Sequence, residues 1–282
     1  MTNSNKVTIL DIQSKKERKQ PVTMLTAYDY PGALLVDEAG VDIILVGDSL
    51  AMTVLGHSGT VAVTIDDMLH HCKAVARGGN RAFLVGDMPF LSYQINPAEA
   101  VRNAGRFLKE AAMDAVKLEG GQEVTFAVQA IVQAGIPVMG HLGLTPQTAA
   151  KLGGYKVQGN TAEKAKKLLA DALALEKAGC FSIVLEAIPS PVAEVVSKAL
   201  TIPTIGIGAG PHCDGQILIF HDLLGLFDQF TPKFARQYVN LRPLMVDAFK
   251  SFRQEVESGV FPAPEHTFKM KQAELEEFLN SE

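Results

Sequence analysis

Four short apolar runs in the sequence end on an acidic residue, although acidic residues are rarely buried unless they are paired. The four residues, with the runs before them, are Asp48 (Ile-Leu-Val-Gly), Asp87 (Phe-Leu-Val-Gly), Glu119 (Val-Lys-Leu) and Glu186 (Ile-Val-Leu). If their carboxylates converge to about 5 Å, each pair repels by about 3 kcal/mol at an effective dielectric constant of about 20. Lys117 offsets one charge, and a divalent cation would offset more. Because carboxylate oxygens are hard ligands and no cysteine belongs to the set, we expect Mg²⁺.

The run that ends on Glu119 also carries a cation, Lys117, two positions earlier. Alternate side chains of a strand share a face, so Lys117 and Glu119 point to one side while Val116 and Leu118 point to the other. Such a pair is either a simple buried ion pair or two separate contacts with a ligand. A single Asp often caps a turn, and a lone His such as His141 is most often a core residue. We favour a functional site because all these residues end successive apolar runs.

Eight β-rich runs alternate with helical patterns along most of the chain. The predicted strands begin at Val22, Ile43, Phe83, Val116, Pro137, Ser182, Pro203 and Ile217. Eight such units favour a closed α/β barrel, the (β/α)8 TIM barrel, over an open doubly wound sheet. Barrel enzymes of this kind have their active site at the carboxyl ends of the strands. The residues that the sequence places there are Asp48, Asp87, Lys117, Glu119, His141 and Glu186.

Both ends of the chain depart from this alternation. The first residues are mostly polar, and we expect them to form a short helix or strand that caps the barrel from below. After Pro232 the pattern is purely helical, with candidate helices at 234–258, which Pro243 can interrupt, and at 271–279. These helices are expected to cover the outside of the barrel or a partner subunit. The resulting division is a single barrel domain over 1–282, with a cap segment at 1–20 and a C-terminal helical extension at 232–282.

Composition restricts the class of protein. The 282 residues are 47% hydrophobic, which is enough for a large core in one domain. The net charge of -5 and the scattered Lys and Arg residues argue against a nucleic-acid partner or an anionic membrane surface. No apolar run approaches the roughly 18 residues that span a bilayer. Cys72, Cys180 and Cys213 lie far apart, so we expect no disulfide framework or zinc site, and a cytoplasmic location.

A glycine-rich segment, Gly-Ile-Gly-Ala-Gly at 206–210, follows the seventh predicted strand. Loops at this place bind phosphate in many barrels. The segment lacks the G-x-G-x-x-G pattern of dinucleotide sites. A phosphate cradle and a plain tight loop therefore both remain open.

Several motifs together make the chain resemble the ketopantoate hydroxymethyltransferase family, over about residues 22–268. They are Thr-Ala-Tyr-Asp-Tyr (26–30), Val-Gly-Asp-Ser (46–49), Val-Lys-Leu-Glu-Gly-Gly (116–121), Gly-His-Leu-Gly-Leu-Thr-Pro-Gln (140–147), Gly-Ile-Gly-Ala-Gly (206–210) with Asp-Gly-Gln (214–216), and Glu-Val-Glu-Ser-Gly (255–259). The segment 56–60, Gly-His-Ser-Gly-Thr, departs from the Gly-His-Asp-Ser-Thr expected for that family. Members of the family catalyse the first committed step of pantothenate biosynthesis.

The resemblance implies a (β/α)8 barrel that forms a homo-oligomer, commonly a homodecamer, and that uses Mg²⁺. It implies transfer of a hydroxymethyl group from 5,10-methylenetetrahydrofolate to 3-methyl-2-oxobutanoate, which gives 2-dehydropantoate (ketopantoate) through a Mg-stabilised enolate. The implied roles are metal ligand for Asp48 and Asp87, and for Glu119 either directly or through a water. Asp48, Ser49, Asp87, Lys117 and His141 are assigned to substrate contact, and Glu186 is the general base. The resemblance assigns no residue to the folate.

Two other interpretations compete with this one. A Mg²⁺-dependent barrel of the phosphoenolpyruvate mutase and isocitrate lyase type also handles enolates of 2-oxo acids. Such enzymes usually carry a catalytic cysteine in a mobile lid, and Cys72, Cys180 and Cys213 are poorly placed for that. A catalytically inactive barrel could instead serve as an assembly subunit. Decay of that kind would be expected to remove some of the polar residues at the strand ends, and all of them are present.

Overall fold

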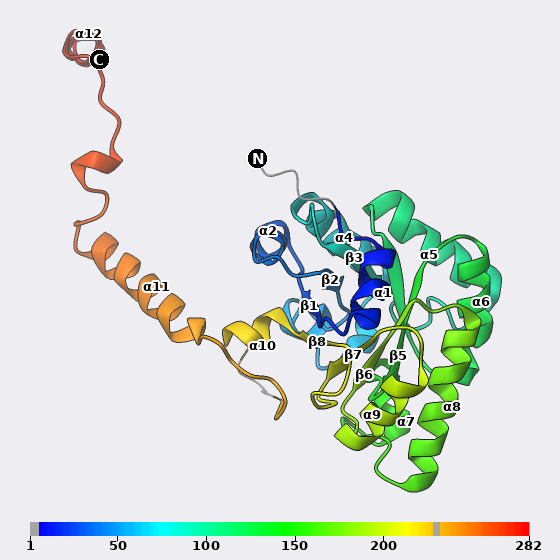
Figure 1. Cartoon of the computed structure of the whole chain (residues 1–282). Helices are drawn as coiled ribbons and strands as arrows, with labels where there is room; N and C mark the ends of the chain where they lie inside the picture. Colours follow the sequence, from blue (N-terminus) through cyan, green and yellow to red (C-terminus); the bar gives the residue numbers. More distant parts are fainter. Residues whose placement is uncertain (1–5, 228–231, 282) are drawn as a thin grey trace.

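The computed structural model describes residues 6–227 and 232–281 of the chain. In these residues eight parallel strands close into a barrel that helices surround (Figure 1). Neighbouring strands follow one another in the sequence, and the last strand pairs with the first. The strands are β1 (Val22–Thr26), β2 (Ile43–Val46), β3 (Phe83–Asp87), β4 (Ala115–Glu119), β5 (Val138–Gly143), β6 (Ser182–Glu186), β7 (Thr204–Ile207) and β8 (Gly215–Leu218). The predicted (β/α)8 TIM barrel is confirmed.

Helices pack on the outside of most strands. The longer helices of this layer are α2 (Tyr30–Glu38), α4 (Ile65–Gly78), α5 (Pro97–Ala111), α6 (Thr125–Gln133), α8 (Ala162–Ala178) and α9 (Ser190–Ala199). The connections contain the shorter helices α3 (Leu50–Thr53), α7 (Ala149–Leu152) and α10 (Phe220–Leu224) and the 3-10 turns η1 (Thr60–Ala62), η2 (Gln122–Val124) and η3 (Pro146–Thr148). Within the described part of the chain, no helix has both the length and the apolar character needed to cross a bilayer.

The strands have one face toward the barrel axis and one toward the helices. On β4, Ala115 belongs to the apolar cluster inside the barrel, whereas Val116 and Leu118 belong to the cluster beneath the helices. Because both faces are covered, β4 is buried along its whole length. The alternation places Lys117 and Glu119 on the same face as Ala115, so both side chains point into the barrel.

The helix starts follow the signals in the sequence. The Thr64 hydroxyl accepts a hydrogen bond from the Asp67 N–H at 3.2 Å, and the Asp67 carboxylate accepts one from the Thr64 N–H at 2.9 Å. This reciprocal capping satisfies two donors that a helix end leaves unpaired. At α5, the Asn96 side chain accepts from the N–H of Glu99, and Pro97 is the first helical residue. These caps fix where the outer helices begin.

The N-terminal segment lies at the end of the barrel where the strands begin. Its helix α1 (Ile9–Glu17) inserts the fully buried Ile12 into the apolar cluster of the barrel interior. Lys15 pairs with Asp42, just before β2, at 2.6 Å. Lys16 pairs with Asp214, just before β8, at 2.9 Å. Helix α1 therefore closes the barrel on the side opposite the carboxyl ends; residues 1–5 of the predicted cap lie outside the described residues.

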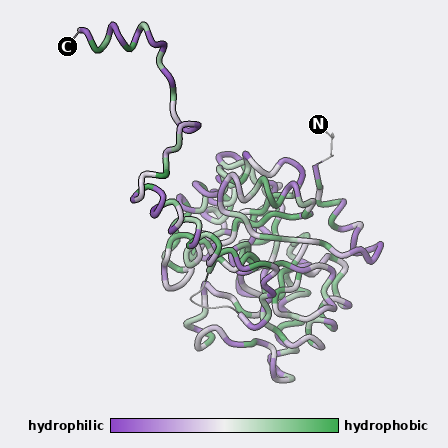
Figure 2. The backbone as a smooth tube through the Cα atoms, turned by 90° about the vertical axis from the view of Figure 1, so that its left-hand side faces the viewer, coloured by the Kyte–Doolittle hydropathy of each residue, from purple (hydrophilic) through white to green (hydrophobic). Residues whose placement is uncertain are grey.

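The C-terminal extension projects away from the barrel (Figure 1). It contains α11 (Leu241–Glu257), the 3-10 turn η4 (Pro264–His266) and α12 (Gln272–Leu279), and neither long helix buries a residue. The helix predicted at 234–258 begins later, at Leu241. Pro243 therefore lies in the first turn, where a backbone N–H has no partner within the helix, so proline does not interrupt the helix. Hydrophobic and hydrophilic residues alternate along α11 (Figure 2). The first residues of the extension stay on the barrel, where Phe234 packs against the apolar cluster of its interior. Helices α11 and α12, by contrast, bury no residue, so they do not cover the outside of the barrel.

Candidate active site

Seven residues that the sequence places in a site surround one cavity of about 660 Å³ at the carboxyl ends of the strands, which we call the mouth cavity. They are Asp48, Ser49, Asp87, Lys117, Glu119, His141 and Glu186. They come from the ends of β2 to β6 because parallel strands of a barrel all end at the same rim. The structure therefore brings the whole predicted set together.

Lys117 forms its closest ion pair with Asp87 on the neighbouring strand. Its Nζ lies 2.6 and 2.7 Å from the two carboxylate oxygens of Asp87, and 3.9 Å from Oε1 of Glu119. Burial by itself lowers the pKa of Lys117, but the charges of Asp87 and Glu119 raise it more, so the ammonium group stays protonated. Lys117 and Glu119 are thus not a simple ion pair, since Asp87 holds the cation.

His141 lies between two of the carboxylates. Its Nδ1 is 3.3 Å from Oε1 of Glu119, and its Nε2 is 3.2 Å from Oε2 of Glu186. The strand register explains the first contact, because Glu119 on β4 pairs with His141 on β5. Burial and the charge of Lys117 lower the pKa of His141, but the two carboxylates raise it to about 9. The imidazole is therefore protonated near neutral pH, and it is not an isolated core histidine.

Two buried residues that sequence analysis did not single out orient the acids. Gln147 donates from Nε2 to Oδ2 of Asp48 at 3.0 Å and from its backbone N–H to Oε2 of Glu119 at 3.1 Å. The Tyr93 hydroxyl lies 2.8 Å from Oε1 of Gln147 and fixes the amide. Gln147 is the last residue of the family motif at 140–147, and this motif could have identified it. Tyr93 lies in the loop after β3, and nothing in the local pattern marks it.

Hydroxyl groups line another part of the mouth cavity. Oγ of Ser49 is 2.8 Å from the hydroxyl of Tyr28. Burial raises the pKa of Tyr28 to about 12, so the phenol is neutral at pH 7 and can donate to Ser49. Thr60, in the segment that departs from the family pattern, has a buried hydroxyl with no hydrogen-bond partner in the described part of the chain. Ser49 and Thr60 can therefore offer hydrogen bonds to a ligand.

The acids differ in how well the protein supports their ionised form. Burial raises the pKa of Asp48, and the charges of Asp87 and Glu119 raise it further. Burial also raises the pKa of Asp87, although Lys117 opposes this effect. At Glu119 the contacts with His141 and Lys117 outweigh burial, so its pKa is lowered. Among these three acids, Asp48 therefore has the least compensating positive charge around it.

This donor set fits a magnesium ion that is held by few protein ligands. When all four carboxylates are ionised, Lys117 and protonated His141 balance only half of their charge, which matches one divalent cation. Across the described ranges, no three His, Cys, Asp or Glu side chains form a complete metal cage. Mg²⁺ commonly takes one or two carboxylates and fills its shell with water and substrate oxygens. Asp48 and Asp87 are adjacent, since the Asp48 N–H donates to Oδ2 of Asp87 at 3.1 Å, and would hold the ion.

The glycine-rich segment 206–210 forms the tight connection after β7. Gly208 and Gly210 have φ values of +65° and +81°, in the left-handed region that favours glycine. A Cβ atom on Gly208 would lie 2.6 Å from the ring of Phe234. Packing and backbone conformation therefore account for these glycines without a phosphate.

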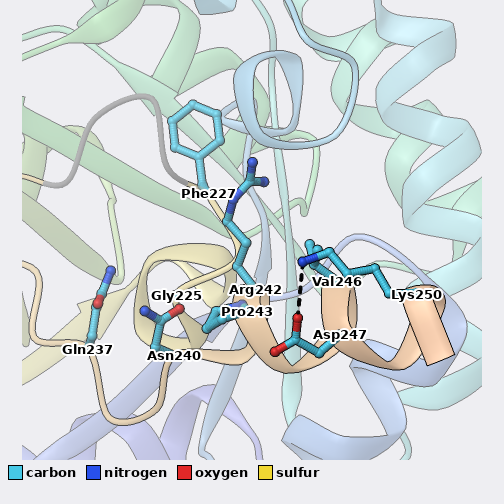
Figure 3. A pocket seen from close by; sticks show the side chains of 9 residues that line it. All are labelled: Gly225, Phe227, Gln237, Asn240, Arg242, Pro243, Val246, Asp247 and Lys250. Carbon is cyan, nitrogen blue, oxygen red and sulfur yellow. Dashed lines mark hydrogen bonds and ion pairs between the residues drawn. The ribbon is translucent and has the colours of Figure 1, made fainter.

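A second cavity, of about 590 Å³, lies at the base of the C-terminal extension (Figure 3). Its wall includes Phe227, Arg242 and an ion pair between Lys250 and Asp247 at 3.3 Å. None of the seven predicted site residues is among its lining residues. We therefore assign the chemistry to the mouth cavity.

The fold and the mouth cavity define the class of protein: a (β/α)8 barrel with acids, a lysine and a histidine converging at the strand ends is an enzyme architecture. A family model described as ketopantoate hydroxymethyltransferase matches residues 6–264. The chain belongs to the ketopantoate hydroxymethyltransferase family, and it is a transferase.

Close relatives cover nearly the whole chain. The 3-methyl-2-oxobutanoate hydroxymethyltransferase of Moorella thermoacetica is 58% identical over 269 residues, which are 95% of this chain and 100% of that protein. The enzyme of the same name from Syntrophomonas wolfei subsp. wolfei is 57% identical over 271 residues, 96% of this chain and 98% of that protein. Similarity at this level supports the family resemblance predicted from the motifs.

Solved structures with the same fold are far more distant in sequence. A phosphonopyruvate hydrolase in complex with oxalate and Mg²⁺ has a TM-score of 0.60 at 12% identity, over 97% of this chain and 96% of that chain. A 2,3-dimethylmalate lyase, a member of the PEP mutase/isocitrate lyase superfamily, has a TM-score of 0.57 at 14% identity, over 97% and 99%. At such identities the likeness shows the fold alone. The competing interpretation is therefore right about the barrel, while sequence similarity assigns the chain to the hydroxymethyltransferases.

Proposed function

We propose that this enzyme transfers a hydroxymethyl group from 5,10-methylenetetrahydrofolate to 3-methyl-2-oxobutanoate and so forms 2-dehydropantoate, with Mg²⁺ as cofactor. The observation that carries the proposal is the convergence of Asp48, Asp87, Lys117, Glu119, His141 and Glu186 around one mouth cavity in a chain of this family. These groups are the acids, cation and base that enolisation of a 2-oxo acid requires.

The mouth cavity offers distinct partners to each part of the 2-oxo acid. The Ser49 hydroxyl, itself paired with Tyr28, is available to the substrate carboxylate. The ammonium group of Lys117 adds positive charge beside Asp87 in a site from which water is largely excluded, where such charge acts strongly. Asp48 and Asp87 would hold the metal. When bound, Mg²⁺ supplies a Lewis acid that polarises the 2-oxo group.

Glu186 is the proposed base that removes the proton from C3 of the substrate. Its side chain is 16% exposed, so it is more accessible than Asp48, Asp87 and Glu119, and Nε2 of His141 lies 3.2 Å from its Oε2. The electron pair left at C3 then forms a bond to the one-carbon unit of the donor. Overall, both C–N bonds of the methylene group break and one water supplies the hydroxyl group. The proton taken from C3 and the second proton of the water end on N5 and N10 of tetrahydrofolate, which then leaves.

Proton NMR of 3-methyl-2-oxobutanoate in D₂O tests the enolisation step. With enzyme and Mg²⁺, the C3 proton should exchange for deuterium without folate, and EDTA should stop the exchange. Glu186→Gln should lose exchange because the amide cannot accept the proton as a base. Absence of exchange under every condition would refute the mechanism, and exchange at the wild-type rate in Glu186→Gln would place the base elsewhere.

We further propose that the enzyme works as a cytoplasmic homo-oligomer, for which the family resemblance implies a homodecamer. The support for assembly is the C-terminal extension, whose helices bury no residue against their own barrel. One face of α11 carries Met245, Phe249, Phe252 and Val256 at helical spacing, with exposures from 43 to 65%. The occupant proposed for this face is a second copy of the chain. Free cysteines are compatible with a reducing compartment.

A further inference from the structure

Asp222 is a buried acid in the mouth cavity to which the proposed mechanism gives no function. It lies in α10, is 5% exposed and contributes to the cavity wall. Its carboxylate has no hydrogen-bond or ion-pair partner within residues 6–227 and 232–281, whereas Asp48, Asp87 and Glu119 all have them. Because Asp222 lines the cavity and none of the described residues pairs with its carboxylate, both oxygens are available to the donor groups of a ligand.

The position of Asp222 separates it from the acids that handle the 2-oxo acid. Burial alone raises its pKa to about 6, and no charge of the acidic cluster contributes to that shift. At neutral pH the carboxylate is therefore largely ionised and acts only as a hydrogen-bond acceptor. Asp222 is suited to bind a group with N–H donors rather than to share the metal site.

The same part of the chain supplies an apolar surface to the mouth cavity. β8 and the residue before α10 contribute Ile217 and Ile219, and Phe234 adds an aromatic ring. An apolar wall with one polar anchor is typical of sites for flat heteroaromatic groups. The cavity volume of about 660 Å³ also exceeds the need of a small branched 2-oxo acid, since pockets of about 300–1,000 Å³ enclose drug-sized ligands.

We propose that Asp222 anchors the pterin ring of the folate donor, by accepting hydrogen bonds from its N3–H and 2-amino groups while Ile217, Ile219 and Phe234 pack against the ring. The two donor groups lie side by side on the ring, which matches the two oxygens of one carboxylate. Lys156 and Lys233 also belong to the cavity lining and can attract the anionic tail of the folate. This inference rests on the proposed function, because it assigns the second substrate of the same reaction.

Calorimetric titration with tetrahydrofolate tests the anchor directly. Asp222→Asn should weaken binding about 10- to 100-fold, because one acceptor oxygen becomes an N–H₂ donor that faces the 2-amino group. The same variant should exchange the C3 proton of 3-methyl-2-oxobutanoate at the wild-type rate. Asp66→Asn, which changes an exposed Asp in a surface ion pair with Arg106, is the matched control and should bind tetrahydrofolate normally. Wild-type affinity in Asp222→Asn would overturn the proposal.

A tetrahydrofolate analogue without the 2-amino group identifies the ring atoms involved. The wild-type enzyme should bind this analogue about 10-fold or more weakly than tetrahydrofolate, and Asp222→Asn should discriminate much less between the two ligands. Equal discrimination by both proteins would show that another residue reads the 2-amino group, and would refute the inference. If the wild-type enzyme fails to exchange the C3 proton, the proposed function fails instead, so the two failures are distinguishable.

Discussion

At the scale of single residues, the mouth cavity depends on how its buried charges are paired. Lys117 and Asp87 are both almost inaccessible to solvent and lie 2.6 Å apart. Such a pair contributes little net stability compared with apolar side chains of the same volume, because both groups lose their hydration. Removing only one partner strongly destabilises the protein, because the other charge is then left buried and uncompensated.

Lys117→Met should therefore destabilise the protein by about 3–5 kcal/mol in the absence of metal. The double variant Lys117→Met with Asp87→Asn should recover much of this loss, because no isolated charge remains at that position. Urea unfolding of the two variants and of Asp87→Asn completes a double-mutant cycle. A double variant as unstable as Lys117→Met would contradict the assigned pairing.

Gln147 orients Asp48 through a hydrogen bond, and we do not expect it to contact the substrate. Gln147→Leu removes the Nε2 donor to Asp48 and the acceptor for the Tyr93 hydroxyl. Groups that orient metal ligands typically change metal affinity by 10- to 100-fold, so the Mg²⁺ concentration needed for C3 exchange should rise by about that factor. Gln129→Leu changes an exposed amide on α6 and should leave the Mg²⁺ dependence unchanged. An unaltered dependence in Gln147→Leu would remove Gln147 from the metal environment.

At the scale of secondary-structure elements, α1 is held to the barrel by two acids just before strands, and one of them, Asp42, is buried. Asp42 accepts hydrogen bonds from Lys15 at 2.6 Å and from the N–H and hydroxyl of Thr23, both at 2.8 Å. Although burial acts in the opposite direction, these contacts lower the pKa of Asp42. The ionised form of Asp42 thus ties α1, β1 and β2 together.

Asp42→Asn should reduce the free energy of unfolding by about 1–2 kcal/mol at pH 7. Because the folded-state pKa lies below the ordinary value of about 3.9, this stabilisation is present above that value and is lost as pH falls through the folded pKa. The difference between variant and wild type should therefore shrink below about pH 4. Denaturant unfolding at pH 7 and pH 3 measures it, with the exposed Glu17→Gln as control. A difference independent of pH would contradict the assigned ionisation.

At the scale of the whole molecule, the barrel and the C-terminal extension have opposite properties. The barrel buries its apolar residues in two clusters, one inside the strands and one beneath the helices. In the extension, α11 instead exposes an apolar face, and α11 and α12 project away from the barrel (Figure 1). A monomeric protein rarely keeps such a contiguous apolar face exposed.

The double variant Phe249→Glu with Phe252→Glu should therefore lower the oligomeric state, because charged groups would have to be buried in the contact. Sedimentation velocity measures the assembly, and circular dichroism verifies that the barrel is intact. Lys250→Glu also introduces negative charge on α11, but outside the apolar face, and should leave assembly unchanged. Sedimentation of the double variant like an oligomeric wild type would refute the contact, and a monomeric wild type would refute the homo-oligomer.

The sequence by itself determined the strands, their order and the acids that end them. These features are local: a strand between two covering layers must be apolar along its length, so a polar residue at its end stands out. Alternation also sufficed to place Lys117 and Glu119 on one face. The helix caps at Thr64 and Asn96 are local in the same sense, because each cap depends on residues only a few positions away.

Only the tertiary structure decided which groups meet. Lys117 pairs more closely with Asp87 than with Glu119 because register and barrel closure bring neighbouring strands together, and these are properties of the whole sheet. Gln147 reaches Asp48 from the connection after β5, and Asp222 reaches the mouth cavity from the connection after β8; the paths of both connections depend on long-range packing. Local periodicity does not encode such distant contacts. The sequence therefore located the acids at the strand ends, but neither Gln147, which orients Asp48, nor Asp222, the fifth acid of the cavity.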